Sequence, residues 1–294
     1  MAPPRSHRPA SRIALAVTAL AAIRPAIWFG QTLADVPGMI VPAAALPGAL
    51  YTLAVLWIDR RERAPAATLA GAVFAGAVGA AWLAHGANTR LLEWAATVVP
   101  GGDARALAAS FGAPAVEEIA KTLALALVVA IGRDRCNGTR DGLVLGALVG
   151  IGFAFTENVV YLTFAVLQGG PAGLLRGVYV RALLGGGNHA AFTATTGAAL
   201  GWARRRRGAA GVRLVPALGL AFAMVQHVVW NAVAASAIAG VLCGPELTGG
   251  PCRPVPTNTS LFVLVPIITA IFIAPGLVTL GAIAFLARRE DESA

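Results

Sequence analysis

Long apolar runs separated by short polar segments dominate this chain of 294 residues. A helix needs about 20 apolar residues to cross the hydrocarbon core of a bilayer. By this measure the pattern predicts an all-α fold, a polytopic membrane helical bundle of about eight transmembrane helices. The predicted helices cover residues 12–30, 39–58, 66–86, 111–131, 142–167, 177–202, 213–240 and 261–286. We expect the segment 87–110 to be a longer connection that lies at the membrane interface or forms a loop.

The composition agrees with a membrane protein, since 57% of the residues are hydrophobic and only 13% are charged. We therefore expect one integral membrane domain over residues 1–294. The net charge of +9 could suggest a nucleic-acid partner. However, the arginines occur in short clusters between apolar runs, which is typical of topology signals. We expect the lipid bilayer to be a partner and nucleic acid not to be one.

The distribution of basic residues predicts the orientation of the chain. If there are eight helices, 16 basic residues lie in segments on one side of the membrane and four lie on the other. The positive-inside rule then places both termini in the cytoplasm of a multi-pass cell-membrane protein. The apolar run after Arg12 is long enough to stay as a first helix, with a cleaved signal peptide as the alternative.

Ionisable residues interrupt four of the predicted helices. Glu117, Glu118 and Lys121 lie in the fourth, Glu157 in the fifth, His189 in the sixth, and His227 with Asn231 in the seventh. A charge at the bilayer centre costs at least a few kcal/mol, so such residues usually face a protein interior or a water-filled cavity. With the predicted orientation, all four helices bring these residues to a similar depth between the midplane and the outer face. We therefore expect one shared cavity.

Helical spacing places some of these residues on common faces, because residues four apart are neighbours. The pairs are Glu117 with Lys121 and His227 with Asn231. Each residue also has a purely structural interpretation: an ion pair between Glu118 and Lys121, or a histidine that only holds helices together. The coincidence of depth favours the functional interpretation.

Four short motifs follow one another in the order PAVEEIAK, FAFTENVVY, NHAAFT and HVVWN. This order resembles the PrsW family of intramembrane proteases, which is related to the CAAX-processing membrane proteases. The resemblance covers roughly residues 111–235, which we take as the predicted catalytic core. It implies an intramembrane endopeptidase that hydrolyses a membrane-anchored protein substrate. Proteases of this type are associated with cleaving anti-sigma factors from the extracytoplasmic side.

The resemblance also implies roles for individual residues. Glu117 is the expected general base, and Glu118 assists it or pairs with Lys121. His189 and His227 bind a metal or polarise the scissile carbonyl group.

Three further positions complete the expected catalytic set. Asn231 is an expected oxyanion donor, and Asn158 belongs to the second motif. Glu157 is a metal ligand or orients one. Glu157, His189 and His227 could supply three zinc ligands, or the centre could work without metal through glutamate, water and histidine. The HExxH signature of many zinc proteases is absent from the sequence.

Two other functions remain open at this point. Chains of Glu, His and Lys also form proton relays, so a proton- or ion-coupled membrane transporter is the main alternative, although the sequence shows none of the inverted repeats typical of transporters. A non-catalytic scaffold is the other. Cys243 and Cys252 flank a Pro/Gly-rich loop, where they could form a disulfide or remain free thiols.

Overall fold

A computed structural model gives the structure of this chain. It describes residues 9–34, 36–60, 64–99, 103–132, 136–206, 211–243 and 257–274, together with the single residues 208, 281 and 285. The possible disulfide between Cys243 and Cys252 lies outside these residues, because Cys252 is not among them.

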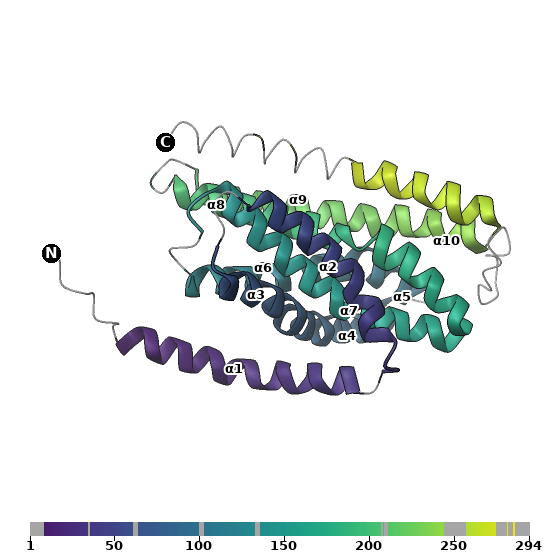
Figure 1. The fold of residues 1–294 in the computed structure, drawn as a ribbon, viewed down its shortest axis with the longest axis horizontal. Coiled ribbons are helices and arrows are strands. Elements are labelled where there is room, and N and C mark those ends of the chain that lie inside the picture. Colours follow the sequence, from purple (N-terminus) through teal and green to yellow (C-terminus); the bar gives the residue numbers. More distant parts are fainter. Residues whose placement is uncertain are drawn as a thin grey trace.

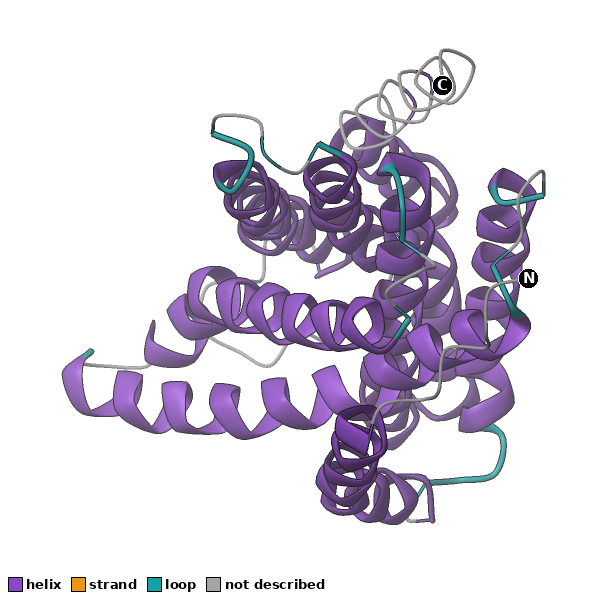
Figure 2. Cartoon of the chain, turned by 90° about the vertical axis from the view of Figure 1, so that its left-hand side faces the viewer, coloured by secondary structure: helices purple, strands orange, loops and turns teal. Residues whose placement is uncertain are grey.

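The described part of the chain consists of helices and short turns, with no strand, which confirms the predicted all-helical fold class (Figure 2). The α-helices are α1 (Pro9–Ala34), α2 (Ile40–Ile58), α3 (Ala66–Phe74), α4 (Ala81–Val98), α5 (Asp103–Leu107), α6 (Ala113–Ile131), α7 (Thr139–Gly177), α8 (Gly187–Arg205), α9 (Leu214–Val229) and α10 (Ala235–Cys243). A further helical segment covers Ser260–Ala274. Figure 1 shows α1 along one edge of the bundle and α9 and α10 on the opposite side, with the yellow segment Ser260–Ala274 outside them.

Short π-helical segments continue several of these helices. They are Ala75–Ala80 between α3 and α4, Ala108–Gly112 between α5 and α6, Val178–Leu184 between α7 and α8, Trp230–Ala234 between α9 and α10, and Ser260–Leu264 at the start of the last helical segment. π-Helical turns inside α-helices are rare and frequently occur at functional sites.

Among the described residues, four helical segments are long and apolar enough to cross a membrane: Ile40–Ile58, Ala66–Val98, Thr139–Arg205 and Leu214–Leu242. The predicted count of about eight transmembrane helices is therefore not confirmed. Two features contribute to the difference. The 19-residue helix α6 carries three charges, Glu117, Glu118 and Lys121, which make it more polar than a usual span. The segment Thr139–Arg205 has 67 residues and reverses its direction within its length.

The reversal of this segment is visible in its backbone and in its packing. Gly170 has a φ of 57°, a left-handed conformation that glycine adopts without strain, and Pro171 follows it. Beyond this point α8 packs antiparallel against α7. A Cβ atom on Gly142 would overlap the backbone of Gly197, and one on Gly150 would overlap the backbone of His189. Small residues at such contacts let two helix backbones approach closely.

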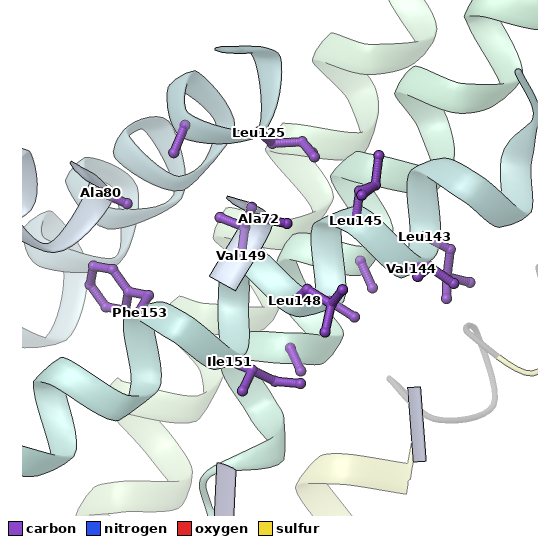
Figure 3. Close-up of a cluster of buried hydrophobic side chains, with 14 of the residues drawn as sticks. Ala72, Ala80, Leu125, Leu143, Val144, Leu145, Leu148, Val149, Ile151 and Phe153 are labelled. Atoms are coloured by element: carbon purple, nitrogen blue, oxygen red, sulfur yellow. The ribbon is translucent and has the colours of Figure 1, made fainter. Parts of the chain in front are cut away.

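Helix α7 is the central helix of the bundle. Every residue from Gly142 to Ala154 is buried, because the run is apolar on all sides and neighbouring helices surround it. Leu145, Leu148 and Val149 form a core cluster with Leu125 of α6 and with residues of α3 and α8 (Figure 3). This packing fixes the position of the polar residues that follow on α7.

The segment between the third and fourth predicted helices differs from the expected connection. Helix α4 continues to Val98, well beyond the predicted end at residue 86, and α5 with its π-helical extension leads into α6. Apolar residues before and after residues 100–102 pack against each other, and this contact accounts for the helices found in place of the expected connection. Ala95 of α4 forms a small cluster with Ala104 and Ala108.

Candidate active site

Helix α6 turns its charged residues inward. Glu117 is 6% exposed, while Glu118 and Lys121 are fully buried. Ile119 and Leu123 of the same helix are 46% and 57% exposed. The helix is thus amphipathic in the inverted sense expected in lipid, with apolar residues outside and ionisable residues inside.

Glu118 is the carboxylate with the most partners. Its Oε1 lies 2.8 Å from Nζ of Lys121 and 3.0 Å from Nδ1 of His227. The hydroxyl of Thr193 donates a hydrogen bond of 3.4 Å to the other oxygen, Oε2. Three helices, α6, α8 and α9, therefore meet at one buried carboxylate. This contact is consistent with a structural ion pair and also with a carboxylate that orients a catalytic histidine.

Lys121 contacts His189 of α8 directly through its ammonium group and is connected to His227 of α9 through Glu118. Nζ lies 2.9 Å from Nδ1 of His189 and 4.1 Å from the ring centre of Phe153. An ammonium group only donates hydrogen bonds, so Nδ1 of His189 accepts this one and the proton of the neutral ring lies on Nε2. The ring centres of His189 and His227 are 5.1 Å apart, nearly perpendicular to each other.

Glu157 of α7 lies on the other side of His189. Its Oε2 is 2.7 Å from Nε2 of His189, and its Oε1 is 2.9 Å from Nη2 of Arg181. The guanidinium group of Arg181 lies 3.5 Å from the ring centre of Tyr161. Arg181 thus holds a carboxylate of the polar cluster.

Glu117 has the loosest contacts of the three glutamates. Nδ2 of Asn88 donates a hydrogen bond of 3.3 Å to its Oε1. Its Oε2 lies 3.7 Å from Nε2 of His227 and 3.8 Å from Nζ of Lys121, and this oxygen accepts no hydrogen bond from the described residues. A carboxylate with one fixed and one unpaired oxygen is arranged to accept a proton or to bind a ligand.

A cavity of about 440 Å³ reaches Glu117 and Glu157. This size is within the range of pockets that bind small ligands. Other polar side chains that line it are His85, Asn88, Thr89, Arg105, Thr156, Tyr161 and Asn231. Residues of α1, α4, α5, α6, α7 and the π-helical segments Ala108–Gly112 and Trp230–Ala234 line the cavity.

The structure brings together six of the eight predicted site residues: Glu117, Glu118, Lys121, Glu157, His189 and His227. Asn231 lies at the cavity, where its Nδ2 donates a hydrogen bond of 3.1 Å to the carbonyl oxygen of Ala109. Asn158 is buried on α7 next to Glu157 but is not among the residues that line the cavity.

Sequence reasoning missed several polar residues of the site, among them Asn88 and Tyr161. Asn88 lies in a segment that was predicted to be a connection, so its contact with an α6 glutamate was not expected. Tyr161 is four residues after Glu157 and shares its helix face, which is a signal that could have identified it.

Comparison with known families identifies the chain. A profile described as the PrsW family intramembrane metalloprotease matches residues 64–272, which include every residue of the polar cluster. The chain belongs to the PrsW family. Searches of curated proteins and of solved structures found no match. Family membership makes this chain a membrane-embedded protease, and the match extends beyond the predicted core 111–235 on both sides.

The description of the PrsW family implies a metal ion, so the donor atoms of the cluster must be compared with a metal site. Glu117, His189 and His227 are buried and offer ligand atoms within 4.8 Å of one another. Ligands of a tetrahedral zinc ion at about 2.0–2.1 Å are about 3.4 Å apart. The separation of 3.7 Å between Oε2 of Glu117 and Nε2 of His227 is close to this value.

The donor chemistry also fits. Nδ1 of His227 contacts Glu118 and leaves Nε2 for a ligand, an arrangement common for metal-binding histidines. Both ring nitrogens of His189 have a partner. To bind the same ion, His189 would have to release Nε2 from Glu157 or Nδ1 from Lys121. The group therefore fits a metal ion. Its carboxylate ligand would be Glu117, whereas the sequence suggested Glu157 for this role.

Proposed function

We propose that this PrsW-family protein hydrolyses a peptide bond of a membrane-anchored protein within the bilayer. The observation that carries the proposal is the cluster of buried glutamates, histidines and a lysine, in which Oε2 of Glu117 accepts no hydrogen bond from the described residues and which adjoins a cavity. A fully paired structural network would need neither feature. Family membership supplies the reaction class.

In the proposed reaction Glu117 is the general base. Its Oε2 takes a proton from water as the water oxygen bonds to the carbonyl carbon of the substrate. The tetrahedral intermediate collapses when the C–N bond breaks and Glu117 returns the proton to the leaving nitrogen. The remaining N–H of Asn231 is the proposed donor to the oxyanion.

The other buried residues keep this centre in place. Glu118 and Lys121 neutralise each other and fix the two imidazole rings through Nδ1 of each. Glu157, held by Arg181, fixes Nε2 of His189. We propose Asn158 as a buried support of the α7 segment that presents Glu157.

A bound zinc ion would be held by Glu117, His189 and His227 in this proposal. When bound, it would act as a Lewis acid and lower the pKa of a bound water molecule. Glu117 is then a ligand, and in the metal-free form it is the base, so the carboxylate is required in both cases.

The distribution of basic residues supports an orientation with both termini in the cytoplasm. In this orientation α5 and its extension lie on the outer side, and Arg105, Ala108 and Ala109 from this region line the cavity. We therefore propose that the site opens to the extracytoplasmic side. An anti-sigma factor with one membrane-spanning helix is the first substrate to test. The whole chain would form one membrane domain with its catalytic core at residues 111–235.

The direct test is cleavage of single-span reporter proteins by the purified protein in lipid vesicles, with the products identified by mass spectrometry. Reactions with and without a chelator, together with metal analysis, separate the two forms of the centre. Cleavage that stops on chelation and returns with zinc supports the metal form, while cleavage that is insensitive to chelation in metal-free protein supports the other. Absence of cleavage of a panel that includes anti-sigma factors would contradict the proposal.

A further inference from the structure

Asn88 is a polar residue of the cavity that none of the four sequence motifs contains. It lies on α4, three residues after His85, and both side chains line the cavity. Its Nδ2 donates a hydrogen bond of 3.3 Å to Oε1 of Glu117. Its Oδ1 is buried and has no hydrogen-bond partner among the described residues.

The orientation of the Asn88 amide follows from its contact with Glu117. An ionised carboxylate only accepts hydrogen bonds, so the NH₂ group of Asn88 must face it. Turning the amide would place two acceptor oxygens against each other and would lose the bond. The carbonyl oxygen of Asn88 is therefore directed away from Oε1 of Glu117.

This arrangement leaves two unpaired acceptors on two hydrogen-bonded side chains. One is Oδ1 of Asn88 and the other is Oε2 of Glu117. A buried acceptor without a donor costs about 1–3 kcal/mol, so the pair favours a partner that supplies donors to both oxygens. A water molecule has two donors, whereas a peptide N–H has one. Water is also the nucleophile of the proposed hydrolysis.

We propose that Asn88 is a positioning residue that holds both the general base and the nucleophilic water. Its Nδ2 fixes Glu117 through Oε1, and its Oδ1 accepts one proton of the water. Oε2 of Glu117 accepts the other. The inference rests on the metal-free form of the proposed function, in which Glu117 is the general base, because it assigns the water of that reaction.

The proton balance of the step assigns separate roles to the two side chains. As the water oxygen bonds to the carbonyl carbon, Oε2 of Glu117 takes one proton and Asn88 retains its hold on the other. The second proton thus stays on the hydroxyl group of the tetrahedral intermediate. Glu117 then protonates the leaving nitrogen, and the products are a carboxylic acid and an amine, which ionise in water. Asn88 is unchanged throughout.

The test compares Asn88→Leu, which keeps the side-chain size and removes both polar atoms, with Thr97→Ala as a control. Thr97 lies on the same helix, its hydroxyl donates a hydrogen bond to the carbonyl oxygen of Trp94, and it is not among the residues that line the cavity. Three quantities are measured in vesicles: kcat and KM for the reporter that the wild type cleaves fastest, and the thermal midpoint. Reporter affinity is measured by fluorescence anisotropy in the Glu117→Gln background, with and without Asn88→Leu.

We expect Asn88→Leu to lower kcat about 100-fold, since misplacing a reacting group can cost this much. KM and the thermal midpoint should stay close to the wild-type values, and reporter affinity should stay close to that of Glu117→Gln alone. Thr97→Ala should cleave the reporter at the wild-type rate. Asn88→Gln, which keeps a donor and an acceptor, should recover part of the lost kcat. If Asn88→Leu does not fold, Asn88→Ala takes its place.

Two results would overturn the role of Asn88. One is a kcat within threefold of the wild type, which would show that the water needs no such partner. The other is a loss of activity matched by a loss of reporter affinity or of thermal stability, which would make Asn88 a structural contact. Cleavage by the wild type and none by Glu117→Gln would leave the proposed function standing in either case.

Discussion

At the residue scale, the glutamates of the buried cluster differ in how tightly they are paired. Glu118 and Lys121 are fully buried and share close contacts with both histidines. Removing one partner of a buried ion pair commonly costs about 3–5 kcal/mol, because the other charge is left unpaired. Substitutions at these two positions will therefore affect folding and chemistry together. Glu117, with its unpaired Oε2, is the position at which chemistry can be tested separately.

The two histidines should behave as one unit. Their rings are in edge-to-face contact at 5.1 Å between centres, and each reaches the Glu118–Lys121 pair through Nδ1. We expect His189→Ala and His227→Ala each to lose most of the cleavage rate, and the double variant to lose little more. Residues of one catalytic unit are strongly non-additive. The rates of the four proteins on one reporter form the measurement.

Metal content gives this experiment a second result. If the histidines bind zinc, each single variant should contain less zinc than the wild type, whereas Asn231→Ala should contain as much. Multiplicative losses of rate in the double variant would mean that the histidines act independently. The shared centre would then be wrong.

At the element scale, the close packing of α7 against α8 positions His189. A Cβ atom on Gly150 would lie 2.6 Å from the carbonyl carbon of His189 and 2.8 Å from Cα of Ala190, so backbone atoms would have to move. We expect Gly150→Ala to lower the free energy of unfolding by about 1–3 kcal/mol, as overpacking does. It should also slow cleavage, because His189 is displaced. Thermal unfolding and reporter cleavage check the two effects.

Gly86→Ala is the matched control for this substitution. Gly86 lies in helix α4, and a Cβ atom there would meet nothing within 4 Å. The change should be neutral or should stabilise the helix by up to about 1 kcal/mol, because alanine has the higher helix propensity. Equal stability and activity of Gly150→Ala and Gly86→Ala would show that α7 and α8 are not in close contact at Gly150.

The spacing of residues within a helix and the order of the helices determine how much of the site the sequence could predict. The inward face of α6 was predictable, since residues three and four apart share one side of a helix. The common depth of Glu157, His189 and His227 followed from the alternation of apolar runs and arginine clusters. The contacts of Asn88 with Glu117 and of Arg181 with Glu157 were not predictable, because they depend on how distant helices rotate against each other.

At the scale of the whole molecule, the number of crossings was the least predictable feature. Hydropathy predicts two transmembrane helices within the 67-residue segment Thr139–Arg205. The antiparallel packing of glycines of α7 against α8 agrees with two helices. In α6 the three charged residues lower the hydropathy by which a transmembrane helix is recognised. A polar helix can cross a bilayer when other helices cover its charged face, and this depends on tertiary packing that hydropathy does not contain.

The orientation of the molecule gives a labelling prediction. We expect Met39→Cys, between α1 and α2, to react with a membrane-impermeant maleimide in intact cells. Arg206→Cys, after α8, should react only after permeabilisation. The reason is the excess of basic residues on the predicted cytoplasmic side. Mass-tagged gels of the two variants, made with Cys243 and Cys252 replaced by serine, provide the measurement.

The native Cys136 does not interfere with this experiment. It is fully buried, and burial raises the pKa of its thiol to about 11, so almost no reactive thiolate exists at neutral pH. Labelling of Arg206→Cys but not Met39→Cys in intact cells would invert the topology. The cavity beside α5 would then open to the cytoplasm.

The central claim is that Glu117 performs peptide-bond hydrolysis in this cavity. Its most direct test is the cleavage rate of a single-span reporter by wild-type protein and by Glu117→Gln, reconstituted in matched vesicles and followed by mass spectrometry. Removal of a general base typically lowers the rate 10²–10⁴-fold. We therefore predict a loss of at least about 100-fold, with the thermal midpoint and helix content retained. Cleavage by Glu117→Gln at the wild-type rate would contradict the account.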